Sequence, residues 1–214
     1  MVSILLAFAI DASWDARSER VRLEAALQNV VSEVSEGREE LEGSLRRNRF
    51  RMARLERFLS LSPEGAAALH PDSARAIAVS LVPPSPFDPG GVALQSMLGG
   101  GSLDLVADST LANALIAWAQ LPDELEEDHR AASALASAVG EAAARHGVAT
   151  ALLNADEAPS IPGAPGLATA LHSMRRDPDG TDRTAQLLNE YRDFTGQLAD
   201  GLTLADEVIA LAGR

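Results

Sequence analysis

The chain has 214 residues, of which 46% are hydrophobic, so a single domain can bury a sizeable core. Its formal net charge of −13 disfavours nucleic acid and anionic lipid as general partners, because these polyanions bind basic proteins and release counterions. The absence of cysteine excludes disulfides, thiolate chemistry and Cys-ligated zinc, and all 18 basic residues are arginine.

Residues 2–10 are almost entirely apolar, and a charged segment follows them directly. This run is about half of the roughly 20 residues that span a bilayer. Two interpretations are open: the C-terminal part of a transmembrane anchor over residues 1–12, or an apolar helix end that packs on a partner. We favour the anchor, because a tryptophan stands where an interfacial aromatic residue would. Its predicted positions are Ile4, Leu5, Leu6, Phe8, Ile10 and Trp14.

Residues 11–61 carry the longest helical pattern in the chain. Apolar or small residues recur there at steps of three and four, which keeps one face of a helix turned toward a core. The sequence predicts a helix of about fifty residues, roughly 75 Å long, since no proline interrupts it. Gly37 and Asn48 interrupt the apolar stripe. Ser62 followed by Pro63 is typical of an N-cap and the first residue of a new helix.

The middle of the chain is broken into short elements. The pattern predicts short helices over 63–69 and 71–81, an extended linker at 83–86 and another helix over 88–98. The three glycines Gly99–Gly101 resemble a phosphate-binding loop only in composition, since no Lys-Ser/Thr follows them. They predict a helix end and a tight turn.

Two further long helices are predicted in the second half. Asp108 is a candidate N-cap for a helix that Pro122 should kink or split and Gly147 should end. A short helix over 166–175 precedes a final helix from 181 to about 212. The chain therefore predicts an all-α fold, an antiparallel helical bundle of three long amphipathic helices plus several short ones. We expect it to form a single domain over 13–214.

Two stretches carry a resemblance to a known family. They are SILLAFAIDASWDARSERVRLEAAL over residues 3–27, and a short helix, glycine and apolar string over 93–111. Both resemble a family of uncharacterised bacterial single-span membrane proteins with a helical soluble part. The resemblance implies an inner-membrane location with the soluble part in the periplasm, an orientation that stays open here. It implies no activity.

Arginines cluster within residues 46–57 of this otherwise acidic chain, and two phenylalanines fall among them. One interpretation is that the phenylalanines pack under a short helix and the arginines meet the acidic run Asp123, Glu124, Glu126, Glu127 and Asp128. The other is a docking face for an acidic partner or a second subunit, since Arg and Phe are common interface anchors. The docking residues would be Arg46, Arg47, Phe50, Arg51, Arg54, Arg57 and Phe58.

The sequence gives little support for a catalytic site or a metal site. Glu126 and His129 have the Glu-x-x-His spacing of a helical metal site, but His70, His146 and His172 lack an acid three residues earlier. An exposed histidine is the ordinary explanation. No Gly-x-Ser-x-Gly or Ser-x-x-Lys motif is present. We therefore expect no enzyme activity, no cofactor and no metal site.

These observations predict a membrane-tethered accessory or interaction domain that acts through protein contacts. The predicted partners are the membrane, through the N-terminal helix, and a second copy or an acidic protein. An alternative is a small-molecule sensor with an apolar pocket between helices near Met97, Trp118 and the Gly99–Gly101 turn.

Overall fold

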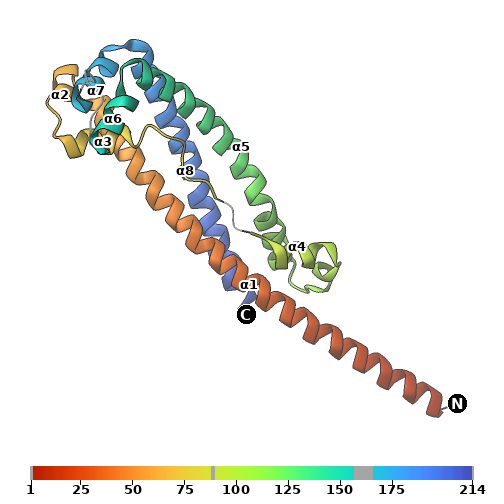
Figure 1. The fold of residues 1–214 in the computed structure, drawn as a ribbon. Helices are drawn as coiled ribbons and strands as arrows, with labels where there is room; N and C mark the ends of the chain where they lie inside the picture. The colour runs from red at the N-terminus through yellow and green to blue at the C-terminus, as the bar shows by residue number, and fades with distance from the viewer. Residues whose placement is uncertain (1, 88–89, 157–165, 214) are drawn as a thin grey trace. The chain divides into compact units, whose positions relative to one another are not determined.

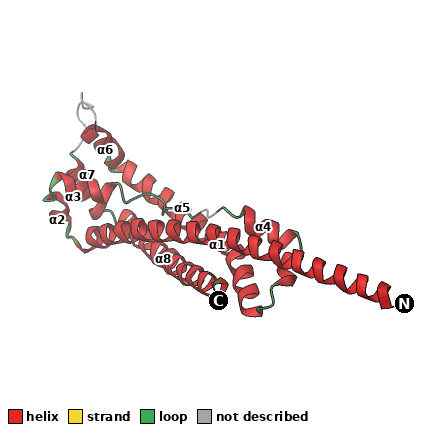
Figure 2. Ribbon diagram, turned by 90° about the horizontal axis from the view of Figure 1, so that it is seen from below, coloured by secondary structure: helices red, strands yellow, loops and turns green. Residues whose placement is uncertain are grey.

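The computed structural model describes the backbone of residues 2–87, 90–156 and 166–213, with all side chains there except those of 2–13, 15–16 and 154–156. Within this part of the chain, the elements are helices and no strand occurs (Figures 1 and 2). The predicted all-α fold is therefore confirmed. The α-helices are α1 (Val2–Ser60), α2 (Pro63–Ala67), α3 (Pro71–Ala78), α4 (Val92–Gly99), α5 (Ser109–Arg145), α6 (Val148–Asp156), α7 (Leu167–Arg176) and α8 (Pro178–Ala212), and a 3-10 turn covers Ser102–Leu105.

Helix ends lie where short polar residues and glycines predict them. Ser62 and Asp108 cap α2 and α5, because their side-chain oxygens accept backbone N–H bonds of 3.1 and 2.8 Å. Gly101 and Gly147 have φ values of +69° and +76°, a left-handed conformation that glycine adopts without strain. α5 continues as one helix through Pro122 and is not split there.

The stripe on α1 is buried as its spacing predicts. α1 is continuous for 59 residues, so it is longer than the expected helix. Leu23 and Leu27, near the start of the stripe, are half-buried, and Asn48 is fully buried in the stripe. The buried apolar positions of the stripe are Val30, Val34, Leu41, Leu45 and Leu55.

The predicted membrane anchor is corrected by the structure. Among the described residues, no helix combines the length and the apolar character that crossing a bilayer requires. α1 carries its apolar start directly into charged residues such as Arg17 and Glu19, and Trp14 is 71% exposed. The side chains of Ile4, Leu5, Leu6, Phe8 and Ile10 lie outside those described. The transmembrane anchor and the inner-membrane location that depended on it are therefore withdrawn.

Contacts divide the chain into two compact units, and α1, α5 and α8 each contribute to both. The first unit comprises residues 1–41, 88–122 and 200–214. In it, the Glu33 carboxylate accepts backbone N–H bonds from Ala93 at 2.7 Å and Leu94 at 3.3 Å, which caps the start of α4. Gly201 of α8 permits close packing, since a Cβ there would lie 2.9 Å from Leu121 Cδ2.

The second unit comprises residues 42–87 and 123–199. Arg192 bonds to Glu56 at 2.9 Å and Thr195 to Met52 at 3.3 Å, so α8 runs antiparallel to α1. The short helices α2, α3, α6 and α7 pack around one end of the long helices (Figure 1). Fully buried large side chains of its core include Leu55, Phe58, Ile77, Leu171, Met174, Leu187 and Tyr191. The single domain expected for 13–214 stays a prediction.

Candidate functional site

The predicted docking residues lie on the C-terminal third of α1, in the second unit. Arg46, Arg47, Phe50 and Arg51 line an open cavity of about 480 Å³ together with Val79 and Ser80, which follow α3. The guanidinium of Arg54 lies over the Phe50 ring, with its Cζ 4.5 Å from the ring centroid, a cation–π contact. We use the name arginine face for Arg46, Arg47, Phe50, Arg51, Arg54 and Val79.

The two phenylalanines of this segment lie in different surroundings. Phe50 is 55% exposed, whereas Phe58 is fully buried in the core of the second unit. Arg57 is exposed, but it does not line the cavity of the arginine face. We therefore leave Arg57 and Phe58 out of the arginine face. Val79, which is 41% exposed, belongs to it although no sequence pattern pointed to it.

Residues 82–87 form an extended segment, which we call the strap, drawn yellow in Figure 1. The predicted non-helical linker lies within it. Five consecutive carbonyls of the strap, from Val82 to Pro86, each accept a hydrogen bond from a side chain of α1, α5 or α8. The bonds are Tyr191 to Val82 (2.9 Å), Arg51 to Pro83 (2.8 Å), His129 to Pro84 (3.2 Å), Asn48 to Ser85 (3.3 Å) and Ser44 to Pro86 (2.8 Å).

Asn48 is the central side chain of this arrangement. Besides donating to the Ser85 carbonyl, it accepts the Ser85 N–H through Oδ1 at 2.8 Å, so its amide binds both main-chain groups of one residue. Asn48 is fully buried, and a buried amide requires such partners. Sequence reasoning did not predict this contact; the signal that could have found it is a polar residue inside an apolar stripe, which does not identify the partner.

Two arginines of the arginine face also hold the strap. Arg47 donates through Nε to Ser85 Oγ at 3.1 Å and through Nη2 to Ser44 Oγ at 2.9 Å. Arg51 donates through Nη1 to the Pro83 carbonyl. A guanidinium carries five N–H donors, so each of these contacts orients the group and leaves donors for another acceptor.

Tyr191 and His129 hold the strap from the other two long helices. Burial raises the pKa of the Tyr191 hydroxyl, while the nearby Arg51 charge opposes that shift. The hydroxyl therefore stays protonated at neutral pH and donates to Val82. His129 donates from Nε2 to Pro84, and its ring lies 5.8 Å from that of Phe194.

The acidic run on α5 does not reach the arginines. Glu126 pairs with Arg130 one helical turn away, and Arg46 pairs with Glu42 on its own helix. Within the described part of the chain, no ion pair joins the arginines of 46–57 to the acidic residues of 123–128. The acidic residues of this run therefore do not neutralise the arginine face, in which Arg46 is paired with Glu42.

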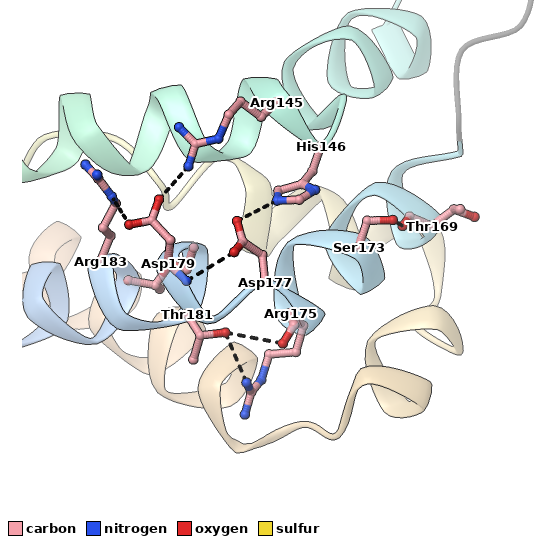
Figure 3. A network of polar contacts seen from close by, with 11 residues as sticks. Arg145, His146, Thr169, Ser173, Arg175, Asp177, Asp179, Thr181 and Arg183 are labelled. Atoms are coloured by element: carbon pink, nitrogen blue, oxygen red, sulfur yellow. Dashed lines mark hydrogen bonds and ion pairs between the residues drawn. The ribbon is translucent and has the colours of Figure 1, made fainter.

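A second polar network joins the end of α5 to the turn between α7 and α8 (Figure 3). His146 donates to the Asp177 carboxylate at 2.8 Å, and Arg145 and Arg183 both bind Asp179. The hydrogen bond from His146 is the largest influence that lowers the pKa of Asp177, and the contacts with Arg183 and then Arg145 lower the pKa of Asp179. The network fastens the start of α8, since Asp177 Oδ1 also accepts the Asp179 N–H.

We expect Asp177→Asn to lower the melting temperature at neutral pH. A carboxyl whose pKa falls below its ordinary 3.8 on folding stabilises the fold above that pH, and the effect is lost as acid protonates it. The difference between variant and wild type should therefore close as the pH falls from about 5 to below 3. Asp177 directly precedes α8, and Asn caps the start of a helix about as well as Asp does. The substitution therefore changes mainly the charge. A difference that persists unchanged in acid, or an equal one for the exposed Asp182→Asn control, would contradict this role.

The residues of the predicted sensor pocket are part of a core. Met97 and Trp118 are each 2% exposed in the first unit. An apolar cavity of about 510 Å³ opens in that unit between α1, the 3-10 turn, α5 and α8, with neither residue in its lining. Its apolar lining includes Leu23, Leu27, Leu105, Leu111 and Leu211.

Comparison with family models, with curated proteins and with solved structures found no match to the chain. Neither the fold nor the arginine face thus gains an assignment from a relative.

Proposed function

We propose that the protein is a non-catalytic interaction domain that binds an acidic protein partner through the arginine face. One observation carries the proposal: Phe50 stands half-exposed among arginines and lines the same cavity as Arg46, Arg47 and Arg51. Single exposed apolar residues are ordinary on protein surfaces. An aromatic ring grouped with guanidiniums is the composition that anchors protein interfaces.

Electrostatics supports an acidic partner. The arginine face is a local reversal of sign in a chain of net charge −13, so other acidic surfaces of the chain repel such a partner. The acidic partner is then attracted to the arginine face alone. Such attraction increases the specificity and the rate of association more than the affinity. Because Arg46 is exposed and Arg54 only half-buried, salt should screen much of the attraction.

The proposal is tested by charge reversal at two arginines that do not hold the strap. We expect Arg46→Glu/Arg54→Glu to weaken binding of a labelled poly-glutamate peptide by about tenfold in fluorescence anisotropy, while the fold stays intact. Arg17→Glu/Arg20→Glu is the matched control, since it changes the same charge on exposed residues of the same helix. Rising salt should weaken binding to the wild type.

Two results would overturn the proposal. One is equal loss of binding in the control, which would mean that net charge and not this face attracts the peptide. The other is the absence of salt-sensitive binding. Light scattering on the protein alone at low and high salt shows whether a second copy occupies the face, because a dimer that dissociates with salt and with Arg46→Glu/Arg54→Glu would identify it.

A further inference from the structure

The cavity of the arginine face combines two chemistries in a small space. Arg46, Arg47 and Arg51 supply positive charge, and Phe50 and Val79 supply apolar surface. Its volume of about 480 Å³ lies near the lower end for ligand-binding pockets, so it admits a side chain or a short segment and not a folded domain. An occupant that satisfies the whole lining must present carboxylates and an apolar group together.

The guanidiniums of Arg47 and Arg51 are oriented before any partner arrives. Arg47 is bound to two serine hydroxyls and Arg51 to a strap carbonyl. The strap is itself fixed along five consecutive carbonyls, so these acceptors cannot shift freely. Side chains that are already ordered lose less entropy on binding, which raises affinity for an acceptor of matching geometry.

The apolar part of the cavity is also ordered. Arg54 covers one face of the Phe50 ring, and Val79 offers a second exposed apolar surface in the same cavity. Apolar anchors surrounded by charged groups have the arrangement of interface hot spots, in which the surrounding groups exclude water from the centre. A large apolar side chain placed there would bury surface that the free protein leaves in contact with water.

The chain's own acidic run matches only half of this lining. Asp123, Glu124 and Glu127 are exposed, but the neighbouring Leu121 and Leu125 are buried. A second copy could therefore offer carboxylates from this run without an adjacent large apolar side chain. This run of a second copy therefore matches the lining less well than a segment of another protein that carries both groups.

Resting on the proposed function, we propose that the arginine face recognises a short acidic segment that inserts one large apolar side chain between Phe50 and Val79. Arg47 and Arg51 bind the carboxylates beside that side chain, and the strap is the element that positions both arginines. The partner is thus defined by an apolar residue flanked by Asp or Glu.

The test compares three labelled peptides: poly-glutamate with a central Leu, the same peptide with a central Ala, and poly-glutamine with the central Leu. We expect the Leu-containing acidic peptide to bind about tenfold more tightly than either of the others. Phe50→Ala should abolish the preference for Leu over Ala and leave the weak binding of the Ala peptide unchanged. Trp14→Ala removes another exposed aromatic residue of α1 and should change neither.

The outcomes separate this inference from the function on which it rests. Equal binding of the Leu and Ala acidic peptides, with loss of both in Arg46→Glu/Arg54→Glu, would overturn the inference and leave acidic docking standing. A Leu preference that survives Phe50→Ala would also overturn it, because the apolar group would then bind elsewhere. If no acidic peptide binds, the proposed function fails as well.

Discussion

Replacing Phe58 with Ala is expected to lower the free energy of unfolding by about 3–5 kcal/mol, the usual cost of removing a buried aromatic side chain. Phe58 is fully buried and belongs to a core cluster with Leu55, Ile77 and Tyr191. The neighbouring side chains come from different helices and cannot all close the space that the ring leaves. Urea denaturation followed by circular dichroism measures the change.

Phe50→Ala is the matched comparison, because it alters the same residue type on the same helix. Phe50 is more than half exposed and makes the contact with Arg54, so its loss should cost about 1 kcal/mol or less. If both variants lost a similar amount of free energy of unfolding, the assignment of Phe58 to the core and Phe50 to the surface would be wrong.

Asn48→Leu is expected to lower the free energy of unfolding by about 2–6 kcal/mol. Leu has nearly the shape of Asn but leaves both the N–H and the carbonyl of Ser85 without their partner, and each buried unpaired group costs about 1–3 kcal/mol. The same denaturation experiment measures it. The strap should also become more accessible to proteolysis.

Asn189→Leu provides the control for that substitution. Asn189 is exposed on α8, and among the described residues its side chain bonds to that of Arg192 one turn away, so the change should stay within about 0.5 kcal/mol. If Asn48→Leu cost no more than this control, the strap would not depend on the side chains that hold it.

Helix ends and the long apolar stripe could be predicted because their causes are local. Ser62 and Asp108 satisfy N–H groups two or three residues away, and Gly147 adopts its conformation without reference to distant parts of the chain. The stripe of α1 follows from helical periodicity alone. These features required no knowledge of which helices pack together.

The different positions of Phe50 and Phe58 could not be predicted from periodicity. Both fall outside the stripe, but near the C-terminal end of α1 buried side chains of α3, α6 and α7 join one core cluster with Leu55 and Phe58. Phe58 lies in that cluster, whereas Phe50 lies about two turns earlier and remains exposed. The membrane anchor fails for a different reason, because a short apolar run does not by itself indicate a longer span.

The polar contacts of the strap could not be predicted from local sequence patterns either. Its donors Asn48, His129 and Tyr191 are far apart in the sequence, and no spacing rule joins them to residues 82–86. Only the prolines could be interpreted locally, as an extended segment. The sequence therefore identified the arginine cluster but not the element that orients two of its members.

The docking site is tested most directly by titrating the acidic peptide with a central Leu into isotope-labelled protein and following the backbone amide signals by NMR. We predict that the largest chemical-shift changes occur at residues 46–54 and at Val79 and Ser80, with smaller changes along the strap. Changes concentrated elsewhere, for example around the cavity lined by Leu23 and Leu27, would contradict the assignment of the arginine face as the docking site.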